Sequence, residues 1–195
     1  MERTVALPKD KKIFSMQELK ENGLSQYKVG KLVNEGKLLK LNKSHYENME
    51  YKGEESDFYY VSAYASEGVV CLLSAAVHYN LTTYIPDAVD VAIPRKGRIS
   101  IMPDWPKMNV HYYTDERYSL GISAVEEGRN GFRIYDIEKT VVDIIFYREK
   151  VGIEETKEIL VNYLRRKNRN LNRLLEYSKL MKCEKTVRQY LEVLV

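Results

Sequence analysis

Residues 25 to 36 set polar and basic side chains opposite an aliphatic stripe on a predicted helix. At 100° per residue, the stripe consists of Val29, Leu32 and Val33. Lysine neutralises DNA phosphates, and the amides of Asn and Gln pair with adenine edges. A helix that buries aliphatic residues and exposes such side chains suits a DNA major groove. The predicted contacts on this helix are Gln26, Tyr27, Lys28, Lys31 and Asn34.

Cap and turn signals predict the elements that would position this helix. Ser15 and Glu18 have the spacing of a capping box, which begins a first helix, and Gly23 favours its end. Ser25 is a suitable cap for the second helix. After Gly36, the segment LLKLNKSHY predicts a hairpin that turns at Asn42-Lys43, with Lys40 and Lys43 as further DNA contacts.

Helix, glycine turn, helix and hairpin is the order of a winged helix-turn-helix. We therefore predict a DNA-binding domain over residues 1–55. The alternative is a helical hairpin whose lysine face is merely solvated. Charge favours the first interpretation, because residues 1–47 carry a net charge of +4, whereas residues 48–94 carry −6.

The rest of the chain, residues 56–195, predicts an α+β region. Segments with alternating apolar residues within 57–135 predict a small mixed sheet with packed helices, including a strand with Val89, Val91 and Ile93 inward. Two prolines and the only Trp within 99–108 predict a packed loop. From Asp136, a predicted helix cap, the apolar period becomes helical and remains so, which predicts a helical C-terminus over 136–195.

Other chemistries lack a signature. The three His residues are about thirty positions apart, and there is no C-x-x-C, so we expect no metal. No glycine-rich phosphate loop or G-x-S-x-G appears, so we expect no cofactor. Asp136, Glu138 and Asp143 are read as a helix cap, a dipole-favoured acid and a partner for a loop amide or arginine. No catalytic set emerges, and we expect a protein that is not an enzyme.

A basic cluster is a second candidate surface. It consists of Arg165, Arg166, Lys167, Arg169 and Arg173. One reading is a phosphate-contacting patch, another is a dock for an acidic partner, and the third is a solvated helix end.

Three stretches in this order resemble the AbiEi family, the antitoxin-regulators of AbiE-type (type IV) toxin–antitoxin systems. They are the helix-turn-helix with Gly36-Lys37-Leu38 and Tyr46, the run GVVCLLSAAVHYNL with a strand ending at Pro94, and GFRIYDIEKTVVDII. Family members read "E-[RK]-T-[LV]-x-D" where this chain has Glu138 to Asp143, and they often have Gly where it has His45.

The resemblance implies a repressor of its own operon that also counters a nucleotidyltransferase-like toxin in abortive infection and phage defence. Two alternatives stay open: a nuclease with an appended winged helix, and a plain regulator whose C-terminal part binds a ligand or dimerises. We expect a monomer or homodimer. Because no run approaches the length of a membrane span and Cys71 and Cys183 are isolated, we expect a cytoplasmic protein without a membrane partner.

Overall fold

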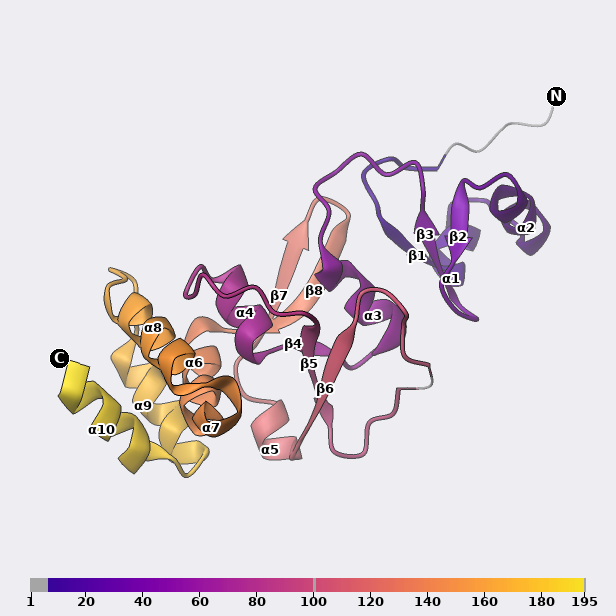
Figure 1. The fold of residues 1–195 in the computed structure, drawn as a ribbon. Helices are drawn as coiled ribbons and strands as arrows, with labels where there is room; N and C mark the ends of the chain where they lie inside the picture. Colours follow the sequence, from indigo (N-terminus) through magenta and orange to yellow (C-terminus); the bar gives the residue numbers. More distant parts are fainter. Residues whose placement is uncertain (1–6, 100, 195) are drawn as a thin grey trace.

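A computed structural model describes residues 7–99 and 101–194, and over these residues it is a mixed α+β fold with ten α-helices, one 3₁₀ segment and two sheets (Figure 1). The predicted α+β class is confirmed. The smaller sheet and helices α1 and α2 lie at one end of the molecule, and α6 to α10 gather at the other.

The first unit forms around a three-stranded antiparallel sheet with strand order β1-β3-β2. Its elements are β1 (Ile13–Ser15), α1 (Met16–Glu21), α2 (Gln26–Asn34), β2 (Leu38–Lys40) and β3 (His45–Asn48). Both predicted caps are confirmed: Ser15 and Glu18 form the capping box, and the Ser25 hydroxyl accepts from the Lys28 amide. Strand β1 lies in a stretch that carried no strand prediction, because three residues are too few to show a period.

The helices of this unit close over one apolar cluster. Its buried members include Phe14, Leu19, Val29 and Leu38. Gly23 and Gly36 follow α1 and α2 with φ of 80° and 70°, a conformation that glycine adopts without steric cost. The predicted glycine ends of both helices are therefore confirmed.

The second sheet has five strands in the order β6-β5-β4-β8-β7. They are β4 (Val69–Val70), β5 (Val89–Pro94), β6 (Met108–Tyr113), β7 (Ile122–Glu127) and β8 (Asn130–Tyr135). The pairs β5/β6 and β4/β8 are parallel, and the other two are antiparallel. Between the strands lie η1 (Asp57–Tyr60), α3 (Val61–Tyr64), α4 (Leu72–His78) and α5 (Asp115–Tyr118).

Apolar side chains cover both faces of this sheet. Val89, Val91 and Ile93 of β5 pack in the cluster that includes η1 and α3, as the alternation predicts. Ala92 packs in the opposite cluster with α4 and α6, and Asp90 is buried as well. The predicted inward face is thus confirmed, and the second face of this strand is buried as well because helices cover it too.

The C-terminal region is helical, as predicted, and packs on the α4 face of the sheet. It comprises α6 (Ile137–Phe146), α7 (Arg148–Val151), α8 (Ile153–Leu164), α9 (Leu171–Leu180) and α10 (Glu184–Leu194). None of the described helices is long and apolar enough to cross a membrane.

The packed-loop prediction for residues 99–108 is wrong at its tryptophan. Trp105 is 65% exposed, whereas Pro106 beside it is buried. Sequence favoured burial because the indole is large and apolar, but the connection between β5 and β6 passes over the surface.

Asn130, at the start of β8, ties the first unit to the second sheet. Its side-chain oxygen accepts from the Lys12 amide at 2.7 Å, and its side-chain nitrogen donates to the Asp10 carbonyl and to the Tyr51 hydroxyl, both at 3.1 Å. Asn130 is buried, and its bond to the Lys12 amide is shielded from water. The predicted domain division near residue 55 stays a prediction.

Replacing Asn130 with Ala should lower the free energy of unfolding by about 2 kcal/mol, because it leaves the buried Lys12 amide without a partner. Urea unfolding measures the loss, and hydrogen exchange at the Lys12 amide locates it. The matched control is Arg129→Ala, which removes an exposed ion pair to Asp10 and should cost less than about 1 kcal/mol. Equal losses in the two variants would refute the role of Asn130.

Candidate nucleic-acid interface

Helix α2 presents the predicted polar face to solvent. Tyr27 is 83% exposed, and Gln26, Lys31 and Asn34 are exposed too, whereas Lys28 is half-buried. The helix lies at the end of the molecule away from the second sheet and the C-terminal helices (Figure 1). Its outward face therefore carries an aromatic ring, a cation and two amides that the rest of the fold leaves open.

The lysines of this surface are unpaired within the described part of the chain. Lys28, Lys31, Lys40 and Lys43 form no ion pair there, whereas nearby Lys37 pairs with Glu35 at 2.8 Å. Lys11 and Lys12 are also paired, with Glu18 and with Glu47 and Glu55 respectively. An unpaired lysine keeps its full charge available for phosphate.

The hairpin after α2 carries the other two predicted contacts. Lys40 ends β2, and Lys43 is exposed in the turn. Asn42 shapes this turn, because its side-chain oxygen accepts from the amides of Ser44 and His45. Its side-chain nitrogen donates to the Ala63 carbonyl at 2.8 Å, which fixes the hairpin against α3. The turn is thus ordered with His45, rather than a glycine, before Tyr46.

The basic cluster does not join this surface. It lies in the connection between α8 and α9 and, with Arg173, in the first turn of α9, at the opposite end of the molecule from α2 (Figure 1). Arg166 donates to the Tyr79 carbonyl and Arg169 to the Arg166 carbonyl, both at 2.9 Å, and Arg173 is 4.0 Å from Asp136. Arg165 and Lys167 are exposed and form no ion pair among residues 7–99 and 101–194. Three of the five members therefore make contacts within the protein.

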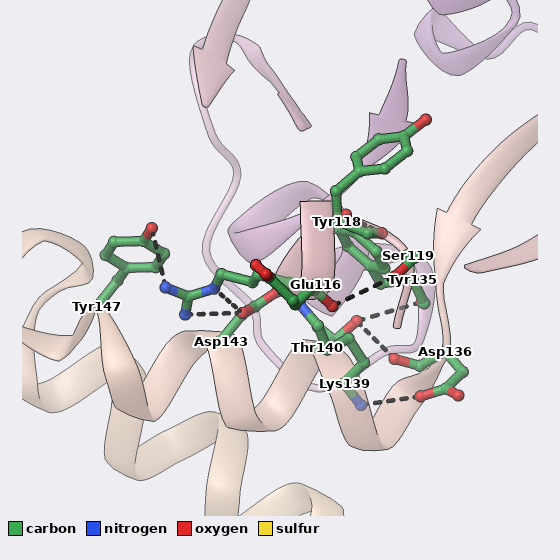
Figure 2. Close-up of polar contacts among 10 residues, drawn as sticks. Glu116, Tyr118, Ser119, Tyr135, Asp136, Lys139, Thr140, Asp143 and Tyr147 are labelled. Atoms are coloured by element: carbon green, nitrogen blue, oxygen red, sulfur yellow. Dashed lines mark hydrogen bonds and ion pairs between the residues drawn. The ribbon is translucent and has the colours of Figure 1, made fainter. Parts of the chain in front are cut away.

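Helix α6 holds buried charges that sequence reasoning noticed only in part. Lys139 and Asp143 have fully buried side chains and pair at 2.5 Å, and Arg117 of α5 pairs with the same carboxylate at 3.1 Å. The guanidinium also donates to the Tyr147 hydroxyl, as Figure 2 shows. The predicted arginine partner of Asp143 is thus confirmed. The predictions did not include Lys139. Its i,i+4 spacing to Asp143 in an apolar helix was the signal that the two side chains pair.

Aromatic rings surround these charges. Lys139 Nζ lies 4.1 Å and 5.1 Å from the ring centres of Tyr135 and Tyr113, and Arg117 lies 3.9 Å from that of Phe146. Burial lowers the pKa of Lys139, although Asp143 opposes that shift. Burial raises the pKa of Tyr113 well above its usual range, and Asp143 adds to the effect.

The two other carboxylates of this helix hold its neighbours. Asp136 caps α6 through the Lys139 amide and accepts from the Tyr177 hydroxyl of α9, each at 2.8 Å. Glu138 is buried and accepts from the Asn170 amide and from the Tyr163 hydroxyl. The cap is confirmed, but the reading of Glu138 as a dipole-favoured acid omitted its role as a link to the α8–α9 connection.

The remaining reactive types do not converge. Within the residues that the structure describes, no group of three His, Cys, Asp or Glu side chains is arranged to hold a metal. Cys71 and Cys183 are free and buried, and burial raises the pKa of both thiols. A thiol with a raised pKa is a poor nucleophile.

No protein-family model matches the chain, and no curated protein matches it either.

Two substitutions in α6 should differ sharply in their effect on the free energy of unfolding. Asp143→Asn leaves two buried cations without a counter-charge and should cost about 3 to 5 kcal/mol of unfolding free energy. Lys139→Met keeps the Arg117–Asp143 pair, removes the desolvated cation and should cost about 1 kcal/mol or less. Urea unfolding at neutral pH tests the asymmetry, and equal costs would contradict it.

Proposed function

We propose that the first unit is a winged helix-turn-helix that binds double-stranded DNA and represses the operon encoding the protein. Helix α2 is the proposed recognition helix, and the β2–β3 hairpin is the wing. One observation carries this function: the outward face of α2 joins an exposed Tyr27 and Asn34 to a Lys31 that forms no ion pair within the described residues.

The proposed binding mode divides the work between two kinds of contact. Gln26, Tyr27 and Asn34 are candidates for base edges, because amides pair with adenine and an aromatic ring packs on the thymine methyl. Lys28, Lys31, Lys40 and Lys43 are candidates for phosphate, which sets affinity and register. A monomer on direct repeats and a homodimer on a palindrome both agree with this surface.

The larger part of the chain is proposed to counter a nucleotidyltransferase-like toxin, so that the protein is an antitoxin as well as a repressor. Support comes from the order of its sequence motifs and from Arg165 and Lys167, two exposed cations available to an acidic partner surface. This activity requires binding alone and no catalytic step. Two free thiols agree with a reducing compartment, and we place the protein in the cytoplasm.

DNA binding is tested with the full chain on its own upstream DNA and on a scrambled duplex, over a salt series. Specific binding is expected, with affinity that falls steeply as salt rises. Lys31→Ala should weaken binding and reduce the slope of log K against log salt by about one, since one phosphate contact is lost. Lys185→Ala on α10, remote from α2, is the control and should leave the slope unchanged.

Equal affinity for the two duplexes would overturn sequence-specific binding by α2. An unchanged slope in Lys31→Ala would remove Lys31 from the interface.

The antitoxin activity is tested by expressing the nucleotidyltransferase-like reading frame next to the gene, with and without this protein. Growth arrest that the wild-type chain relieves is expected. Lys31→Ala should relieve it equally, because α2 lies apart from the larger part of the chain. The absence of such a reading frame, or growth arrest that persists, would refute the antitoxin activity. Ligand binding or dimerisation would then be the remaining function for the larger part of the chain.

A further inference from the structure

A cleft of about 420 Å³ opens on the α4 side of the second sheet, remote from α2. Strands β5 and β6 form its floor, the start of α4 and the segment 84–87 form one side, and α7 with Tyr147 forms another. Its volume lies within the range of small-molecule sites, about 300 to 1,000 Å³. Neither the recognition helix nor the basic cluster contributes to it.

Asp90 supplies a buried carboxylate at the floor. Its side chain is 8% exposed, and its Oδ1 accepts from Nε2 of His111 at 2.9 Å and from the side-chain nitrogen of Asn109 at 3.4 Å. Oδ2 has no hydrogen-bond donor among the described residues. It is also not enclosed, since the buried side-chain polar atom without a partner in the described chain is the Tyr113 hydroxyl. Asp90 therefore uses one oxygen for His111 and Asn109 and keeps the other for the cleft that it lines.

A buried carboxylate with one unpaired oxygen favours a ligand that donates a hydrogen bond. Removing most of its water leaves Oδ2 with an unmet need for a hydrogen bond, and a donor that is itself charged gives the strongest one. The cleft holds a second carboxylate, Asp87, against one lysine, Lys150. This balance disfavours an anion.

Tyrosines complete the lining. Tyr84 is 43% exposed, and Tyr147 stands at another wall, whereas the side chain of Tyr112, in register with Ile93, lies on the opposite face of the sheet. Aromatic faces attract cations, with ammonium and guanidinium groups within about 6 Å of a ring centre. Lys150 already places its Nζ 5.8 Å from the Tyr147 ring, so the ring left for a ligand is that of Tyr84.

We infer that this cleft binds a small organic cation with N–H donors, a guanidinium, amidinium or amine, whose charged group meets Oδ2 of Asp90 and whose body packs on Tyr84 and the apolar wall. The wall is formed by Leu72, Leu73 and Val151. This site is independent of DNA binding by α2. The same chemistry occurs in a free metabolite and in an arginine side chain.

Benzamidine and benzamide are the matched probes, because they have nearly the same shape and only the first carries a charge. Each is titrated into the full chain and followed by calorimetry and by amide chemical shifts. Benzamidine should bind, with shifts at Asp90, His111 and Tyr84, and benzamide should bind at least tenfold more weakly. Equal binding of the two, or no binding of benzamidine at 10 mM, a concentration about tenfold above a 1 mM Kd, would overturn the cation site.

Variants locate the charged contact. Asp90→Asn keeps the acceptor for His111 and removes the charge, and it should weaken benzamidine binding by about tenfold or more. Tyr84→Leu should weaken it severalfold, and the exposed position of Tyr84 makes misfolding an unsuitable explanation for a loss. Asp115→Asn, an exposed carboxylate outside the cleft, is the control and should bind as the wild type does. Unchanged binding in Asp90→Asn would also overturn the site.

Agmatine and the peptide Gly-Gly-Arg-Gly-Gly distinguish the two sources of the cation. Tighter binding of agmatine would support a free metabolite, and tighter binding of the peptide would support an arginine of a partner protein. Failure of both to compete with benzamidine would count against a natural cation at this site.

Discussion

The larger part of the fold depends on one buried carboxylate. Asp143 lies between Lys139 and Arg117, and its side chain, like that of Lys139, has no exposure. Residues 138 to 145 of α6 are all buried, so this helix has no solvated face for its charges. Every polar group on such a helix needs a partner inside the protein, because an unpaired buried charge costs several kcal/mol. Packing of α5, α6 and the sheet is thereby restricted to the arrangement that brings Arg117 to Asp143.

The same requirement extends from α6 to the helices around it. Asp136 binds Tyr177 of α9, and Glu138 binds the backbone at Asn170, before α9 begins. The two carboxylates thus fix where the α8–α9 connection lies and, with it, the exposed Arg165 and Lys167. A surface proposed for partner binding is in this way positioned by buried acids on a different helix.

Charge is handled in opposite ways at the two ends of the molecule. Around α6, cations are buried and paired with Asp143, where aromatic rings replace part of their lost hydration. On α2 and the hairpin, lysines are exposed and lack ion pairs within the described residues, so their charge is available to a polyanion. The carboxylate of Asp90 lies between these extremes. Its side chain is buried, one of its oxygens is hydrogen-bonded, and the other faces the cleft. These three environments explain how the fold combines a buried, paired core with separate surfaces that are proposed to bind ligands.

Local signals in the sequence determined most of the elements. Ser15, Ser25 and Asp136 were recognisable as caps because a helix start needs a side-chain acceptor within three residues, and Gly23 and Gly36 marked helix ends for an equally local reason. The outward face of α2 followed from helical periodicity alone. Tertiary structure decided the rest: the burial of both faces of β5, the exposure of Trp105, and the meeting of Arg117 with Asp143 across 26 positions. The sequence likewise did not determine that Asp90, Tyr84 and α7 line one cleft. Such contacts depend on how distant segments pack, and a local pattern carries no information on which segments become neighbours.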